Sequence, residues 1–148
     1  MDGTSETAVH TEPSTQRRRY LPAIARILMG LGFFVFGLNG FLHFIPNPKT
    51  PMPEGVVAFN EAMMKTGYLF QLVMGTQLLV GVLLLLNRFV PLALVLIMPV
   101  LVNIIAFHIF LQPAGLLPGA VLMVFELYLA WAYRSHYRSV LVARAKPD

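Results

Sequence analysis

The chain has 148 residues, of which 57% are hydrophobic and only 12% are charged, and its formal net charge is +4. A mean hydropathy of +0.68 indicates a membrane protein, so the positive charge points to topology and attraction to anionic lipid rather than to nucleic-acid binding. The absence of cysteine excludes disulfides, thiol catalysis and cysteine-ligated iron–sulfur clusters within this polypeptide.

The first stretch, residues 1–16, is rich in Ser, Thr, Glu and Pro and holds almost no apolar side chains. It cannot bury enough surface to order itself, so it is predicted to be a disordered tail. The arginines at 17–19 and the apolar run after them resemble an export signal, but the run is too long for a cleaved signal and lacks an A-x-A site. We therefore expect an uncleaved first span, with cytoplasmic tails at 1–19 and 138–148 around a transmembrane domain at 20–137.

Four windows are long and apolar enough to cross a bilayer, which takes about 20 residues of helix. They stay apolar around nearly the whole helical circumference, as expected for lipid on one side and other helices on the other. The predicted fold is all-α: a polytopic membrane protein built as a four-transmembrane-helix bundle. The expected spans are roughly Leu21 to Ile45, Tyr68 to Leu86, Phe89 to Leu111 and Leu116 to Tyr133.

The first connection begins with a proline-rich segment, which prevents the first helix from continuing past Ile45. The segment from Glu54 to Lys65 is predicted to form a short helix, because Val56, Phe59 and Met63 make one apolar stripe. We expect this helix to lie on the outer membrane surface or to cap the bundle. A packing role that covers helix ends is favoured over a substrate lid.

Basic residues orient the bundle. Nine of the eleven flank one side of the predicted spans, and the opposite side holds Lys49 and Lys65, offset by Glu54 and Glu61. By the positive-inside rule both termini are cytoplasmic, in a bacterial-type plasma (inner) membrane. The nine are Arg17, Arg18, Arg19, Arg26, Arg88, Arg134, Arg138, Arg144 and Lys146.

Strongly polar residues within the spans gather in the outer half of the bundle, and every helix contributes. Such residues face the protein interior because exposing them to lipid is costly, so we expect them to line a ligand-binding pocket. The outer tier is His43, Gln71 and His108, and the inner tier is Asn39, Gln77, Asn103 and Glu126.

Plainer interpretations of these residues stay open. Amides in spans commonly join helices by hydrogen bonds, and histidines near an interface can simply meet water. Glu126 has no lysine or arginine at its depth, so we expect it to be neutral and hydrogen-bonded to Asn39, Gln77 or Asn103. No metal site is predicted, because Glu126 lies roughly 7 Å below the two histidines at about 1.5 Å of helical rise per residue.

The third span contains Pro99, which should kink the helix just before Asn103. Asn103 and His108 are five residues apart and would not share a face on an ideal helix. A kink or a local π-bulge could bring the two side chains together.

Four stretches resemble the DoxX-like family of small membrane proteins: "RILMGLGFFVFGLNGFLHF", "TGYLFQLVMGTQLLVGVLLLLNRFVPLAL", "PVLVNIIAFHIFL" and "WAYRSHYR". The resemblance covers roughly residues 24–137. It implies a four-helix bundle and, for some members, association with quinone-linked or sulfur-oxidising membrane oxidoreductase complexes or with oxidant-defence partners. Catalytic residues stay unknown, because the chain has no H-E-x-x-H, G-x-S-x-G or P-loop pattern.

Three functions are compatible with the sequence. The first is an accessory subunit of a membrane redox complex that binds a quinone or similar molecule, with His43 or His108 bonded to its carbonyls. Its partners would be the bilayer, a membrane or soluble redox protein and a second copy of the chain. The second is a structural or assembly protein without a ligand. The third is a small-solute carrier with Glu126 as a proton-linked site.

Overall fold

The computed structural model of the protein describes residues 14–46 and 51–138. Within these ranges the chain is helical and has no strand. The elements are α1 (Ser14–Leu42), α2 (Glu54–Lys65), α3 (Leu69–Leu85), α4 (Val90–Phe110), η1 (Pro113–Gly115), α5 (Leu116–Ala132) and η2 (Arg134–Tyr137). The predicted short helix over 54–65 is confirmed with the same bounds. Helix α1 begins inside the stretch assigned to the first tail, while residues 1–13 and 139–148 of the two tails lie outside the described ranges.

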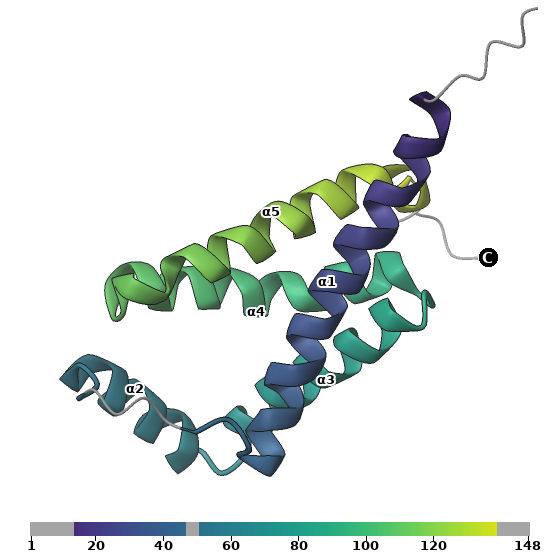
Figure 1. Cartoon of the computed structure of the whole chain (residues 1–148). Helices are drawn as coiled ribbons and strands as arrows, with labels where there is room; N and C mark the ends of the chain where they lie inside the picture. The colour runs from purple at the N-terminus through teal and green to yellow at the C-terminus, as the bar shows by residue number, and fades with distance from the viewer. Residues whose placement is uncertain (1–13, 47–50, 139–148) are drawn as a thin grey trace, which may run out of the picture.

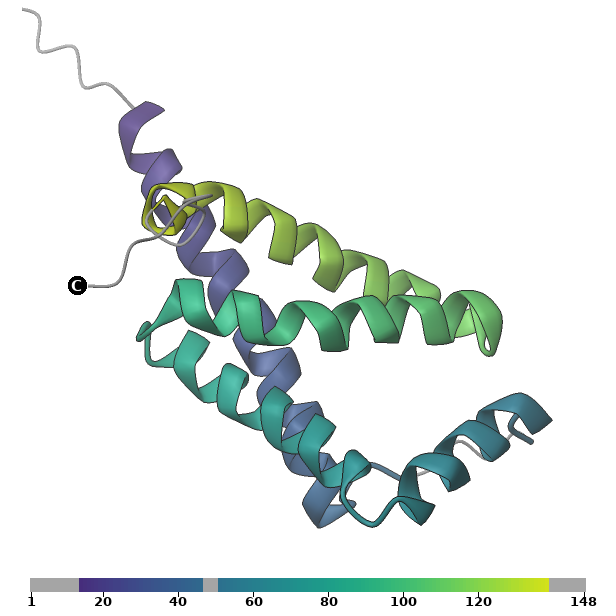
Figure 2. The ribbon, with the colours of Figure 1, turned by 180° about the vertical axis from the view of Figure 1, so that it is seen from behind.

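The four long helices form two antiparallel pairs, α1 with α3 and α4 with α5. The pairs meet where α3 leads into α4 and diverge toward their other ends (Figure 1). Helix α2 lies on the open side of this divergence, on the chain between α1 and α3, as the reverse view also shows (Figure 2). The result is a bundle that is closed at one end and spread at the other.

Helices α1 and α3 approach each other unusually closely because glycines stand at their contact. A Cβ on Gly37 would lie 2.5 Å from the backbone nitrogen of Leu78, and one on Gly81 would lie 2.5 Å from that of Phe34. Neither distance is compatible with a side chain, so only glycine allows this backbone contact. Small residues serve the same purpose at many helix contacts in membranes.

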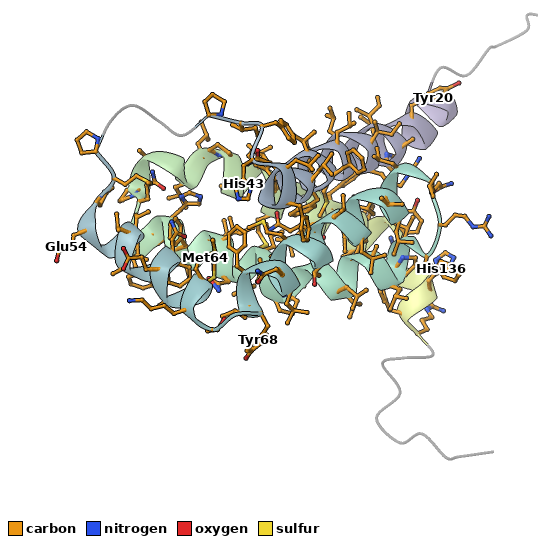
Figure 3. The ribbon with its side chains drawn as sticks, turned by 90° about the horizontal axis from the view of Figure 1, so that it is seen from below. Tyr20, His43, Glu54, Met64, Tyr68 and His136 are labelled. Atoms are coloured by element: carbon orange, nitrogen blue, oxygen red, sulfur yellow. The ribbon has the colours of Figure 1, made fainter. Side chains whose placement is uncertain are left out.

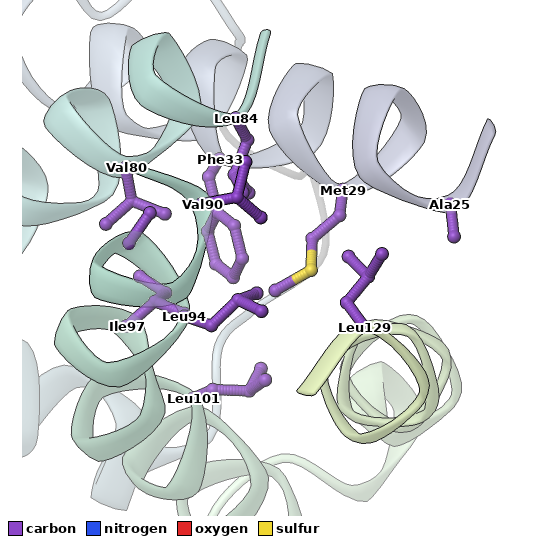
Figure 4. Close-up of a cluster of buried hydrophobic side chains, with 11 residues drawn as sticks. Ala25, Met29, Phe33, Val80, Leu84, Val90, Leu94, Ile97, Leu101 and Leu129 are labelled. Atoms are coloured by element: carbon purple, nitrogen blue, oxygen red, sulfur yellow. The ribbon is translucent and has the colours of Figure 1, made fainter. Parts of the chain in front are cut away.

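The core lies at the closed end, where all four long helices contribute apolar side chains. Met29 of α1, Leu84 of α3, Leu94 of α4 and Leu129 of α5 are fully buried and belong to one cluster (Figure 4). Large apolar side chains are also exposed on the outer faces of the helices, for example Leu92 and Val124. That exposure is compatible with contact to a lipid bilayer.

Two polar side chains fasten the closed end. The Arg26 guanidinium, only 8% exposed, donates Nη1 hydrogen bonds to the carbonyl oxygens of Leu84 and, at 3.5 Å, Leu85. These carbonyls belong to the last turn of α3, where backbone donors run out, although Leu84 also accepts the Asn87 N–H at 3.2 Å. A buried cation adds hydrogen bonds to them and complements the helix dipole. The Tyr137 hydroxyl donates to the carbonyl of Pro91 at 3.2 Å and ties η2 to the start of α4.

Three described segments are long and apolar enough to cross a membrane: Tyr20–Leu42, Val90–Phe110 and Pro113–Ala132. The predicted second span corresponds to α3, which has 17 residues and meets α2 at a bend of 93°. At about 1.5 Å per residue such a helix is somewhat shorter than a hydrocarbon core of about 30 Å. Helix α3 therefore counts as a fourth span only if it is taken together with α2 as one broken span.

Candidate functional site

A cavity of about 630 Å³ lies between the two diverging helix pairs, and all five α-helices line it. Figure 3, seen from below, labels His43 at the end of α1 and residues along α2 and its junction with α3. The volume is in the range of pockets that hold small organic ligands. Most of the wall is aromatic or aliphatic. The polar lining residues are Asn39, His43, Asn60, Gln77, Asn103 and His108.

Five of the seven predicted site residues thus line one cavity, although they come from three helices. Gln71 and Glu126 do not line it. Gln71 is exposed, because the cavity face of α3 carries Phe70, Val73 and Gln77 instead. One residue along a helix is a rotation of about 100°, so Gln71 follows Phe70 but points away from it.

Asn39 and His43 meet the cavity through the end of α1. The helix stops at Leu42, and His43 has a φ of 51° in the left-handed region. Its N–H donates to the carbonyl of Asn39 at 2.8 Å, and the Ile45 N–H donates to Asn39 Oδ1 at 2.7 Å. Asn39 is therefore a local cap for this turn, which leaves its amide Nδ2 to face a ligand.

His108 is held in place by the loop that follows α4. Its Nδ1 lies 3.1 Å from the carbonyl oxygen of Gln112, which can only accept a hydrogen bond. In the neutral ring the proton is therefore on Nδ1, and Nε2 is an acceptor. A side chain on Gly115 would collide with this ring, so the glycine makes room for the histidine.

Gln77 and Asn103, the other two predicted residues that line the cavity, differ in their exposure. Gln77 is 6% exposed, and its Nε2 lies 3.9 Å from Met74 Sδ, a weak acceptor. Asn103 is exposed to the cavity on α4, which is α-helical from Val90 to Phe110. Asn103 and His108 therefore line the same cavity without a π-bulge, because a cavity this wide is reached from neighbouring faces of one helix.

Helix α2 contributes three lining residues, Phe59, Asn60 and Met63. The Phe59 ring packs on the Phe107 ring of α4 at a centroid distance of 5.3 Å and an angle of 54°. The apolar stripe predicted for this helix includes Phe59 and Met63, but the sequence patterns did not indicate Asn60 as a site residue. A polar residue beside the stripe on an interfacial helix is the signal that could have indicated it.

Glu126 is 1% exposed and lies one helical turn below Leu122, which lines the cavity. Among residues 14–46 and 51–138, its Oε2 has no hydrogen-bond partner. The predicted bond to Asn39, Gln77 or Asn103 is therefore not formed by this oxygen, because the three amides line the cavity above it. Leaving a buried polar atom unpaired costs about 1–3 kcal/mol.

Tyr137, at the closed end of the bundle, is a titratable group whose pKa depends on the charge of the Glu126 carboxyl. Burial raises the pKa of the Tyr137 phenol above its ordinary value of 10.0, and Glu126 adds to the effect when its carboxyl is ionised. The phenol is protonated at physiological pH with or without this shift, so Tyr137 is a hydrogen-bond donor to Pro91.

No group of three or more His, Asp or Glu side chains that could hold a metal ion occurs among the residues that the structure describes. The polar chemistry of the cavity is thus that of amides and imidazoles, set in an aromatic wall. These groups bind and orient a molecule through hydrogen bonds.

Comparisons with protein-family models, curated proteins and solved structures found no match for the chain.

Proposed function

We propose that the protein is a membrane protein that binds a lipid-soluble small molecule with a polar head in the cavity between its helix pairs. The observation that carries this proposal is the gathering of six polar side chains around one cavity whose wall is otherwise mostly apolar. Amides that only joined helices would bond to one another, yet Asn39 caps its own chain and Gln77 meets a thioether of its own helix.

The proposed arrangement in the membrane has four spans. The fourth is the bent pair of α3 and α2, in which α3 crosses most of the membrane and α2 lies at its outer end. Four described arginine side chains, Arg26, Arg88, Arg134 and Arg138, flank the closed end, whereas α2 on the spread side carries Lys65 paired with Glu61. By the positive-inside rule the closed end and both termini are cytoplasmic. The cavity then lies in the outer half of the membrane.

The lining suggests the chemistry of the ligand. Within the described residues, Asn39 Nδ2 has no hydrogen bond and can donate, and His108 Nε2 can accept. Asn60 and Asn103 offer both kinds of bond. Phe36, Phe59, Phe70 and Phe107 supply an apolar wall that suits a flat ring. A ring with carbonyl or hydroxyl groups and an apolar tail, such as a quinone, meets these requirements. Membership of a redox or oxidant-defence complex remains a prediction from the resemblance to DoxX-like proteins.

The test uses the full chain purified in detergent. Lipid extracts are compared by mass spectrometry with extracts of an unrelated membrane protein, and binding of decylubiquinone is measured directly. Asn103→Leu should weaken this binding, because one neutral hydrogen bond is worth about 0.5–1.5 kcal/mol, which is roughly two- to tenfold in Kd.

Gln71→Leu is the matched control, because the same amide-to-leucine change falls on an exposed residue outside the cavity. It should leave the Kd unchanged. Equal weakening by both variants, or no enriched lipophilic compound together with no binding of the probe, would overturn the proposal.

A further inference from the structure

Glu126 is a buried carboxyl that the proposed binding site does not use. It is 1% exposed, and its Oε2 has no partner within the described part of the chain. A carboxyl retained in this state is a poor structural element, because leucine would fill the site without an unpaired oxygen. Its position therefore calls for a chemical role.

Among the side chains that the structure describes, Glu126 forms no ion pair. Helices α3 and α4 carry no titratable side chain before His108. On α1 the nearest buried cation, Arg26, donates to the end of α3. On α5 and η2 the titratable neighbours are Tyr128, Tyr133, Arg134, His136 and Tyr137, of which Tyr137 donates to Pro91.

The routes to water on the two sides of Glu126 differ. Toward the cytoplasmic end, Met29, Leu94 and Leu129 are fully buried and close the core (Figure 4). Toward the outer end, a single turn separates Glu126 from Leu122, which already lines the cavity. Gly32 of α1 faces Leu122 with only ordinary van der Waals contact, at 3.7 Å from a Cβ built on it.

We propose that Glu126 is a proton-binding site that exchanges its proton with the outer side of the membrane through the cavity, past Leu122. The carboxyl takes up and releases one proton, which passes to water in the cavity, and no other bond changes. The Leu122 side chain stands between Glu126 and the cavity and sets the width of this path. The site would couple any cavity ligand that carries a proton to the state of Glu126.

The experiment is infrared spectroscopy on the full chain in lipid nanodiscs, with Glu126→Gln as the spectral reference. The carboxylic C=O band of Glu126 is identified by its absence from the spectrum of Glu126→Gln. This band shifts when the carboxyl proton is replaced by deuterium, so the rate of the shift in D₂O measures how readily water reaches Glu126. Leu122→Phe should slow this rate and Leu122→Ala should accelerate it. Val121→Phe and Val121→Ala are matched controls, because Val121 is 44% exposed and does not line the cavity. They should leave the rate unchanged.

Opposite effects of the two Leu122 variants would support the proposal, and the alanine variant keeps the test valid if the phenylalanine variant fails to fold. A rate that is insensitive to Leu122 but changed by Tyr137→Phe would place the path on the cytoplasmic side and overturn it. The absence of any exchangeable carboxyl band assigned to Glu126 would also overturn it. None of these readings requires a ligand, so they are independent of whether decylubiquinone binds.

Discussion

At the scale of single residues, the end of α1 shows how one turn serves both fold and site. His43 follows the last helical residue and has a φ of 51°, a region that L-residues seldom adopt although histidine does so more readily than most. The turn is closed by the Asn39 carbonyl and by Asn39 Oδ1. Asn39 and His43 share a side of the chain because of this cap, rather than because both lie on a continuous helix.

Substitutions at His43 should therefore divide by backbone preference. His43→Gly is expected to keep or slightly raise thermal stability, because glycine adopts a positive φ without strain. His43→Val should lower stability by about 1–3 kcal/mol, since a β-branched residue is poorly tolerated there. Unfolding in detergent, followed by circular dichroism, measures both. If the valine variant unfolds at the wild-type temperature, the left-handed turn is not formed in solution.

At the scale of helices, the contact between α1 and α3 sets the shape of the bundle. Gly37 and Gly81 allow the two backbones to touch, so these helices stay together along their length. Helix α4 approaches α3 mainly where the short link from Leu86 to Phe89 joins them. The divergence of the two pairs, and hence the cavity, follows from one close pair and one short hinge.

Gly37→Ala should destabilise the protein by about 1–3 kcal/mol, because the added Cβ meets backbone atoms that cannot move aside. Gly75→Ala in α3 is the control, since a Cβ there meets nothing closer than the Phe41 ring at 4.0 Å. Alanine also favours a helix over glycine by about 1 kcal/mol, so this variant should be neutral or stabilised. Equal losses in thermal unfolding experiments would show that the close contact does not determine stability.

At the scale of the whole molecule, the described arginines and the cavity lie toward opposite ends. The described arginines flank the closed end, and the cavity lies toward the spread end, where α2 forms part of its wall. Anionic lipid head groups and the positive-inside bias both favour the basic end in the cytoplasm. In this proposed orientation, the proposed ligand enters from the outer half of the membrane.

This orientation can be tested because the chain has no cysteine of its own. Glu54→Cys at the start of α2 and Ser135→Cys in η2 both replace exposed side chains. An impermeant thiol reagent applied to intact cells should label the first variant and not the second, while both should react after permeabilisation. Labelling of Ser135→Cys in intact cells would contradict cytoplasmic termini.

The sequence by itself determined the helical class, the apolar segments, the short helix at 54–65 and most of the polar residues of the cavity. These follow from local rules: proline ends helices, apolar length sets candidate spans, and polar groups avoid lipid. Tertiary structure alone decided that Gln71 faces outward, that Glu126 lies beneath the cavity and that Asn60 belongs to it. The reason is that periodicity gives the relative angles of residues on one helix, whereas the rotation and crossing of helices depend on contacts such as Gly37 with Leu78.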